Sequence, residues 1–304
     1  MMASWDTARP DQSVGRKIMD RKAMAKETLE IMKRGYYEPE SDQAAGQRIT
    51  IKEDMERSVG LSRLISPAEG NQILEKFGVC AGSGQPETRV ENISAVEAIR
   101  ILASEGKTDI GVLNFASAKN PGGGFLNGAM AQEESLAVSG TLYPTLTAHE
   151  EYYRENRAHS SMIYLDYAIY SPDVVFFRDG TFRLTETPVK ASVLTLPAVN
   201  MGQVLLKGEN AEEAKKAMRR RMKLALAIFA EHKARHLVLG AYGCGVFRND
   251  PGEIAVWWRE LLEEGMGQYF DCVFHAVLDR SKDRRCIRAF QEQSDHPRAG
   301  SKER

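Results

Sequence analysis

The sequence contains few cysteines, and none of them forms a CxxC pair or lies near a histidine at zinc-finger spacing. This usage argues against a structural zinc site and against a scaffold stapled by disulfides. It predicts reduced thiols in an intracellular protein. The cysteines are Cys80, Cys244, Cys272 and Cys286.

The chain also lacks a long apolar run and a strong net charge. No segment reaches transmembrane length, and the N-terminus MMASWDTARPDQSVGRK has no apolar signal-peptide core. A formal net charge of -1 gives no basic field for nucleic acid. We therefore expect a cytoplasmic protein (or a nuclear one in a eukaryote) that binds neither membranes nor specific nucleic-acid sequences. Backbone amides and local dipoles would have to hold any anionic ligand.

With 304 residues, of which 42% are apolar and 27% charged, the chain can form one large globular domain. Candidate strands and helices alternate, which predicts an α/β fold with helices on both faces of a largely parallel or mixed sheet. We expect disorder in 1–12, one domain over 13–293 and a disordered tail over 294–304. The expected strands are 48–52, 88–93, 109–116, 163–179 (broken at Ser171-Pro172), 189–199, 236–243 and 269–279. The expected helices are 13–37, 94–106, 132–142, 147–159, 209–233, 251–265 and 284–293.

Helix starts are marked by capping residues. Ser94, with Glu97 three residues later, is typical of an N-cap. Asn249 or Asp250 precedes Pro251, a residue that suits the first turn of a helix.

A glycine-rich loop, NPGGGFLNGAMAQEE (120–134), directly follows the strand expected at 109–116. Ligands of open α/β sheets bind beyond the carboxyl ends of strands, and glycines let backbone N–H groups approach a phosphate. The loop matches neither GxxxxGK[ST] nor GxGxxG, so alone it suits an ordinary surface turn equally well.

A second glycine loop, GAYGCGVFRN (240–249), follows another apolar strand. Together the two loops could hold the two halves of a diphosphate. Phe247 could pack on a sugar or base, or serve as a core or lid aromatic.

Two adjacent acids, Glu133 and Glu134, end the first loop. On a helix they would point about 100° apart, so they should do different jobs. One could act as a general acid beside a sugar, whereas a bare pair of acids also suits the first turn of a helix.

The pattern GGG, seven residues, then QEE resembles the signature of poly(ADP-ribose) glycohydrolases. The surrounding LNFASAKNPGGGFLNGAMAQEESL is similar to the microbial branch of that family, and the likeness runs from about residue 16 to 290. In place of the basic or Cys-Arg element that many relatives carry after QEE, this chain has Ala137-Val138, which touches no expected catalytic position. Supporting stretches are ETLEIMKRGYY (27–37), YSPDVVFFRD (170–179), LTLPAVN (194–200) and LGAYGCGVFRNDP (239–251).

The resemblance implies a three-layer α/β/α macrodomain with a mixed central sheet and an N-terminal helical extension. It implies hydrolysis of ribose–ribose O-glycosidic bonds, mainly from the chain end, with release of ADP-ribose. Glu134 would be the catalytic acid/base, kept protonated by a nearby carboxylate and partial burial, and Glu133 would bind ribose hydroxyls. The implied substrate-binding residues are Asn120, Gly122, Gly123, Gly124, Gln132, Gly243, Gly245, Val246 and Phe247.

The resemblance further implies no metal or other cofactor, a monomer, and ADP-ribosylated proteins as carriers of the substrate. Three alternatives stay open: a macrodomain that reads ADP-ribose without cleaving it, a hydrolase of mono-ADP-ribose on protein or nucleic acid, and a Rossmann oxidoreductase. The missing GxGxxG argues against the last. The basic run over 215–223 is expected to be a solvated helix face rather than a track for the polymer.

Overall fold

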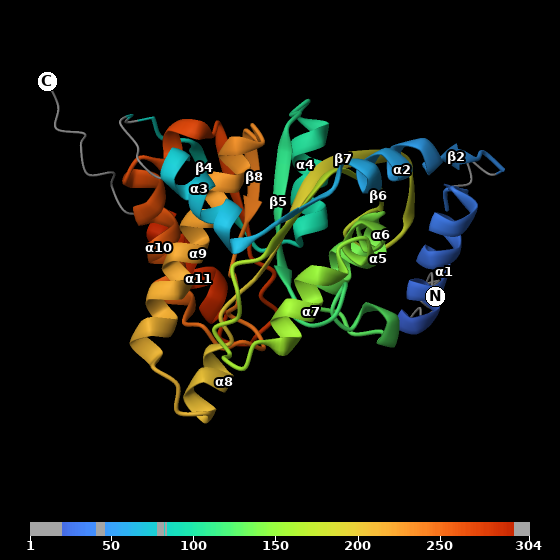
Figure 1. Cartoon of the computed structure of the whole chain (residues 1–304). Coiled ribbons are helices and arrows are strands. Elements are labelled where there is room, and N and C mark those ends of the chain that lie inside the picture. Colours follow the sequence, from blue (N-terminus) through green and yellow to red (C-terminus); the bar gives the residue numbers. More distant parts are fainter. Residues whose placement is uncertain (1–19, 41–45, 78–81, 83, 295–304) are drawn as a thin grey trace, which may run out of the picture.

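The computed structural model describes residues 20–40, 46–77, 82 and 84–294, and these build a seven-stranded sheet in the order β3-β6-β7-β5-β8-β9-β4 (Figure 1). The predicted disordered segments lie outside the described residues, apart from Ser294, as do Cys80 and the first part of the helix expected at 13–37. The strands are β3 (Arg63–Ile65), β4 (Glu87–Glu91), β5 (Ile110–Ala116), β6 (Ala168–Arg178), β7 (Leu184–Pro197), β8 (His236–Leu239) and β9 (Cys272–Ala276).

Helices cover both faces of this sheet, and a small hairpin of β1 (Tyr36–Tyr37) and β2 (Ile49–Thr50) lies apart from it. The helices are α1 (Arg21–Arg34), α2 (Lys52–Leu61), α3 (Pro67–Phe77), α4 (Ala95–Ser104), α5 (Gln132–Ser139), α6 (Leu142–Thr147), α7 (Glu150–Ala158), α8 (Met201–Leu206), α9 (Ala211–Glu231), α10 (Pro251–Glu263) and α11 (Arg285–Ser294). The described residues also contain the 3₁₀ turns η2 (Phe125–Asn127) and η3 (Met266–Tyr269).

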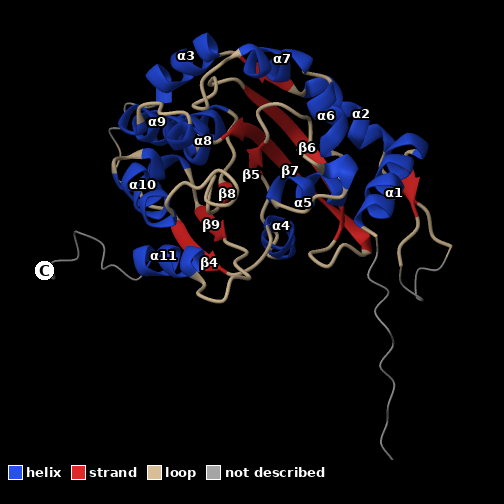
Figure 2. Ribbon diagram, turned by 90° about the horizontal axis from the view of Figure 1, so that it is seen from below, coloured by secondary structure: helices blue, strands red, loops and turns tan. Residues whose placement is uncertain are grey.

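Strands β7, β5, β8, β9 and β4 run parallel, whereas β6 pairs antiparallel with both β7 and β3. The sheet is therefore mixed, which confirms the predicted α/β fold. Alternate residues of each central strand enter different cores, because successive side chains of a strand point to opposite faces. Leu113 of β5 packs with α9 and α10, while its neighbour Val112 packs with α4 and α5. Figure 2 shows these two helix layers on opposite sides of the strands.

The N-terminal helix α1 is fastened to the domain by polar as well as apolar contacts. Thr28 Oγ1 donates to the carbonyl of Val138 in α5 at 2.8 Å. The buried Arg178 of β6 donates to Glu27 at 2.5 Å and to the carbonyl of Phe182 at 2.9 Å. Met24 packs against η2 and α5. This helix therefore forms part of the same wall as the loop between β5 and α5.

The predicted caps hold two helices in place beneath the loops. Ser94 Oγ accepts from the N–H of Glu97 at 3.2 Å, which begins α4. Asp250 Oδ1 accepts from the N–H groups of Gly252 and Glu253, so Asp250 rather than Asn249 caps α10.

The predicted break at Ser171-Pro172 is wrong, since β6 continues through it with a register shift between Ser171 and Val174. Strand β3 pairs only with 168–170, and the register shift leaves Pro172 without a partner residue on β7, so the missing N–H is tolerated. The carbonyl of Pro172 accepts a hydrogen bond from Ser58 Oγ of α2 at 2.5 Å.

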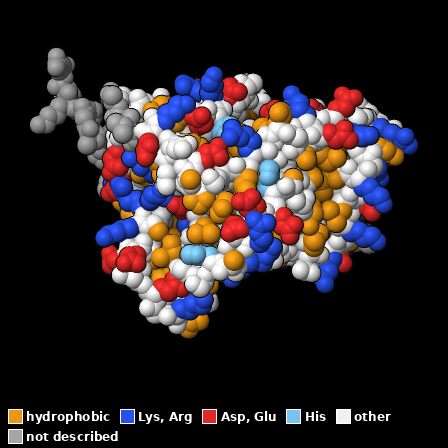
Figure 3. All heavy atoms as spheres, in the orientation of Figure 1, with side chains coloured by type: hydrophobic (Ala, Val, Ile, Leu, Met, Phe, Trp, Pro, Cys, Tyr) orange, Lys and Arg blue, Asp and Glu red, His pale blue; other side chains and the backbone are white. Residues whose placement is uncertain are grey.

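Charges of both signs are interspersed on the face shown in Figure 3, and several basic residues of α9 are paired with acidic ones. Lys215 and Arg219 pair with acidic residues of α10. Arg220 pairs with Asp166 while remaining substantially exposed. The expectation of a solvated face is wrong for Arg221, whose side chain is only 1% exposed.

Candidate active site

A cavity of about 1540 Å³ opens beyond the carboxyl ends of β5 and β8. Its walls come from both glycine loops and from the starts of α4 and α5, with the segment after β9 adding a further side. The volume exceeds that of most small-ligand pockets and can admit a dinucleotide-sized molecule. All the predicted site residues line this cavity except Gly122, which packs toward Tyr143.

Glu133 is held at the bottom of the cavity and is only 4% exposed. Its Oε2 accepts from the N–H of Ser117 at 2.7 Å, and its Oε1 accepts from Nδ2 of Asn114 at 3.3 Å. Burial raises the pKa of Glu133 to about 8, although the two hydrogen bonds oppose that rise. The raised pKa thus belongs to Glu133, the residue directly before the expected acid/base Glu134.

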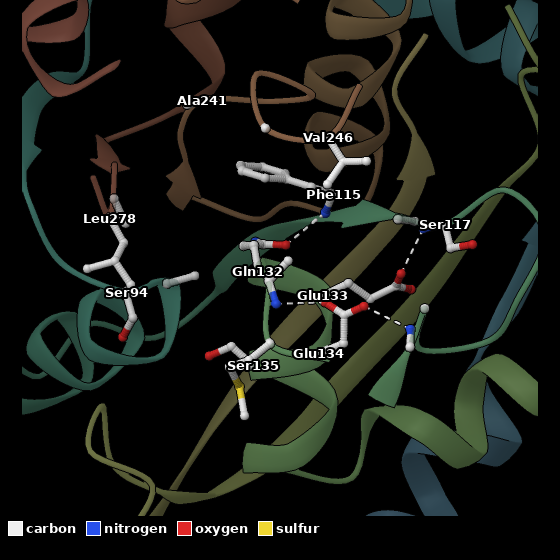
Figure 4. A pocket seen from close by; sticks show the side chains of 18 of the residues that line it. Ser94, Phe115, Ser117, Gln132, Glu133, Glu134, Ser135, Ala241, Val246 and Leu278 are labelled. Carbon is white, nitrogen blue, oxygen red and sulfur yellow. Dashed lines mark hydrogen bonds between the residues drawn. The ribbon is translucent and has the colours of Figure 1, made fainter. Parts of the chain in front are cut away.

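Glu134 is also buried, and both of its oxygens bind the backbone of the preceding loop. Oε1 accepts from the N–H of Gly124 at 2.8 Å, and Oε2 accepts from the N–H of Ala131 at 2.9 Å. The second bond reaches the N-cap residue of α5, whose own alanine side chain cannot cap the helix. Figure 4 shows Glu133 and Glu134 side by side at the start of α5.

Gln132 joins the helix to the sheet rather than offering its amide to the cavity. Its Nε2 donates to the carbonyl of Leu113 at 2.8 Å, and its Oε1 accepts from the N–H of Phe115 at 2.9 Å. This two-way pairing with β5, drawn in part in Figure 4, fixes the first turn of α5 at the strand's end. It thereby sets the position of the two acids that follow.

Gly123 touches both acids. Its φ of +60° lies in the left-handed region, and a Cβ built there would lie 2.5 Å from Glu134 Oε1 and 2.9 Å from Glu133 Oε2. Glycine is thus required both by the backbone conformation and by the space that the carboxylates occupy.

The second loop is supported from behind and open in front. Asn249 Nδ2 donates to the carbonyls of Gly243 and Val199, at 3.0 Å and 2.8 Å. Phe247 lies against Tyr164, with ring centroids 6.1 Å apart. Val246 is 85% exposed at the cavity rim.

The free amides of the second loop distinguish it from the first. In the described part of the chain, the N–H groups of Gly245, Val246 and Phe247 meet no acceptor. Three successive free donors beside a cavity form the kind of concavity that binds anions.

Several cavity residues were missed by the sequence reasoning. They come from α1, from the turn between β6 and β7, and from the segment after β9, none of which carries a local motif. Ser94 was identified only as a helix cap, although a cap beyond a strand's carboxyl end could have suggested a site residue. The missed lining residues include Arg21, Met24, Ser94, Thr181, Phe182, Leu278, Asp279 and Arg280.

Two further features bear on chemistry. The described residues contain no group of three or more His, Cys, Asp or Glu side chains that could hold a metal ion. Cys244 lines the cavity, and burial raises the pKa of its thiol.

Across the described ranges, no helix has the length and apolar character needed to cross a membrane.

Comparisons with known proteins agree with this geometry. Residues 25–179 match the family model of the microbial-type poly(ADP-ribose) glycohydrolase catalytic domain. A search of curated proteins gave no match.

Three solved structures are similar over most of the chain. The poly(ADP-ribose) glycohydrolase of Thermomonospora curvata is 36% identical, with a TM-score of 0.84, over 90% of this chain and 98% of that one. Its complex with the inhibitor ADP-HPD has a TM-score of 0.83 at the same identity and coverage. The Deinococcus radiodurans enzyme in complex with ADP-ribose is 40% identical, with a TM-score of 0.76, over 79% of this chain and 97% of that one. Because the family model spans half of the chain and these enzymes are at least 36% identical to it over most of its length, the chain belongs to the microbial-type poly(ADP-ribose) glycohydrolase family.

Proposed function

We propose that this chain hydrolyses the ribose–ribose O-glycosidic bonds of poly(ADP-ribose), mainly from the chain end, and releases ADP-ribose. The observation that carries the proposal is the pair of buried acids, Glu133 and Glu134, in a cavity that also presents free backbone amides. Support comes from the two similar enzymes, which were solved with ADP-HPD and with ADP-ribose.

The second glycine loop holds the diphosphate in this proposal. Its N–H groups at Gly245, Val246 and Phe247 have no other acceptor among the described residues, so they can donate to phosphate oxygens. The corresponding groups of the first loop are engaged: the N–H of Gly123 donates to Asn120, and that of Gly124 donates to Glu134. The sequence suggested that both loops hold the diphosphate. We now assign this role to the second loop alone.

The first loop then faces the ribose whose bond is cleaved. Glu134 protonates the departing 2′ oxygen while an oxocarbenium-like centre develops on the ribose, and it afterwards takes a proton from the attacking water. Glu133 accepts hydrogen bonds from ribose hydroxyls and orients the linkage. Its raised pKa lets the pair retain a proton at neutral pH, close to the bond that breaks. The mechanism uses no metal or other cofactor.

Glu134→Gln tests this assignment directly. Glutamine has the same shape but cannot protonate the leaving group, so release of ADP-ribose should fall by a factor of about 10³ or more. Binding of ADP-ribose should persist, because one of the two backbone hydrogen bonds remains available to the amide oxygen. The measurement is free ADP-ribose released from automodified protein, with ADP-ribose affinity by calorimetry as the control.

Two outcomes would contradict the proposal. A Glu134→Gln protein with near-normal turnover would remove Glu134 from the mechanism. A wild-type protein that binds ADP-ribose and releases none from the polymer would leave a non-catalytic reader, or a hydrolase of a mono-ADP-ribosyl linkage, to be tested on mono-ADP-ribosylated substrates. That ADP-ribosylated proteins carry the substrate to a monomeric, cytoplasmic enzyme stays a prediction.

A further inference from the structure

Two neighbouring arginines of α9, Arg220 and Arg221, both pair with Asp166, but only one of them is buried. The side chain of Arg220 is 43% exposed and that of Arg221 only 1%. Arg221 Nε donates to Asp166 Oδ1 at 2.8 Å. Burying a guanidinium is costly unless its donors are satisfied, so this position requires more partners than a surface ion pair.

Arg221 finds those partners on backbone carbonyls of two separate segments. Nη1 donates to Ile163 at 2.8 Å and to Pro197 at 3.0 Å, and Nη2 donates to Tyr164 at 3.2 Å. Pro197 ends β7, whereas the other two residues belong to the loop that precedes β6. One planar, forked side chain therefore ties both segments to α9, which a lysine could not do.

Both segments support the second glycine loop from behind. Tyr164 has a left-handed backbone with φ of 61°, and its ring faces Phe247. Such a backbone is unfavourable for a bulky residue and has to be held by its surroundings. Just beyond β7, the Val199 carbonyl accepts from Asn249 Nδ2, the amide that also holds Gly243.

We propose that Arg221 is a positioning residue for the diphosphate-binding loop, resting on the function proposed above. It holds Tyr164 and the end of β7 so that Phe247 and the free amides beside it stay arranged for ADP-ribose. Arg221 itself does not line the cavity, and none of the groups that it contacts makes a hydrogen bond to either acid. Its loss should therefore weaken substrate binding while leaving the bond-breaking step intact.

The test compares Arg221→Met with Arg220→Met, a matched change on the same helix beside the same aspartate. We expect Arg221→Met to weaken ADP-ribose affinity and raise KM for the polymer roughly tenfold, with kcat within about twofold of wild type. Arg220→Met should leave all three values unchanged. Equal affinity in the two variants would overturn the proposal, and so would a fall in kcat at unchanged affinity.

A second variant keeps the test decisive if Arg221→Met does not fold. Tyr164→Gly accepts the left-handed backbone without strain and keeps its carbonyl for Arg221, but it removes the ring from Phe247. We expect ADP-ribose affinity to fall roughly threefold, and unchanged affinity would exclude this route. Calorimetry with ADP-ribose alone measures the affinity of both variants even if the polymer is not cleaved. Failure of the proposed function can therefore be told apart from failure of this inference.

Discussion

The two glycine loops lie at neighbouring strand ends but are ordered in different ways. In the first loop, the N–H of Gly124 donates to Glu134, and the N–H of Ser117, just before the loop, donates to Glu133. In the second loop, Asn249 holds the backbone from behind by donating to two carbonyls, and the N–H groups at the tip have no acceptor among the described residues.

This difference separates two tasks within one cavity. The first loop positions the two acids, because each carboxylate that could act on the substrate also accepts a hydrogen bond from a backbone N–H in or beside that loop. The second loop presents donors that have no protein acceptor among the described residues, so they remain available to a ligand. Changes in the first loop should therefore reduce turnover and stability together, whereas changes in the second should act mainly on affinity.

Among the changes that compare the two loops, Gly123→Ala should have the largest effect. The new Cβ would lie within 3 Å of both carboxylates at a φ that disfavours alanine, so the acids or the loop must move. We expect kcat to fall roughly a hundredfold or more, since small displacements of catalytic groups have effects of that size. Release of ADP-ribose and the melting temperature are the measurements.

The matched control is Gly245→Ala in the second loop, where a Cβ would meet nothing within 4 Å. Its kcat and melting temperature should equal those of wild type. A Gly123→Ala enzyme as active as this control would mean that the first loop does not position the acids.

Glu133→Gln should come next, and its effect on stability should depend on pH. The folded-state pKa of Glu133 is raised to about 8, so between its ordinary value and 8 the folded chain keeps a proton that the unfolded chain has lost. Wild-type stability should therefore fall as the pH rises through this window. Glutamine does not titrate, so the stability of Glu133→Gln should not fall in this way between the two pKa values.

Asn114 adds to this expectation. Its Oδ1 is buried and has no hydrogen-bond partner among the described residues, while its Nδ2 donates to Glu133 and Thr195. If its amide turns over, Oδ1 can accept from the new amide of Glu133→Gln. We expect Glu133→Gln to melt close to the wild-type temperature at pH 5 and roughly 5 °C above it at pH 8. Its turnover should be slower than that of wild type. A variant less stable than wild type at pH 8 would contradict the buried, proton-holding state of Glu133.

Much of the fold could be predicted from the sequence because its signals were local. Strand β5 is apolar apart from Asn114, and α4 and α10 begin at capping residues that the structure confirms. The helices α2, α3, α6 and α8 were missed, since none exceeds 11 residues and such short segments carry little periodicity. They are helical because they pack against neighbouring elements, as α2 does on β6.

The candidate site divides in the same way. Glu133 and Glu134 stand in one contiguous motif, so the sequence could identify them. Phe182 and Leu278 reach the cavity only because β6, β7 and β9 end beside it, which no local pattern encodes. The burial of Arg221 was missed for a related reason, since its partners are carbonyls that the fold supplies from two distant segments.

Gly243→Ala should sharpen the comparison with a smaller effect. At a φ of +72°, its Cβ would lie 2.6 Å from Asn249 Nδ2 and 2.7 Å from the Cβ of Ala198, so the loop or the Asn249 side chain must shift. Because the acids are held elsewhere, we expect ADP-ribose affinity to fall roughly tenfold and kcat to change less than twofold. An equal loss of kcat, measured at saturating polymer, would show that the two loops are not separable.

The smallest expected effect is that of Val246→Ser, at the tip of the second loop. With 85% of its surface exposed, this side chain contributes little to folding, so the melting temperature should not change. A bound ligand would cover it, and loss of the buried methyl groups should weaken ADP-ribose affinity roughly threefold. Calorimetry and a melting curve on the same samples give both values. A lower melting temperature would mean that the tip is already packed without a ligand, and the contrast between a self-ordered first loop and a ligand-ordered second loop would no longer hold.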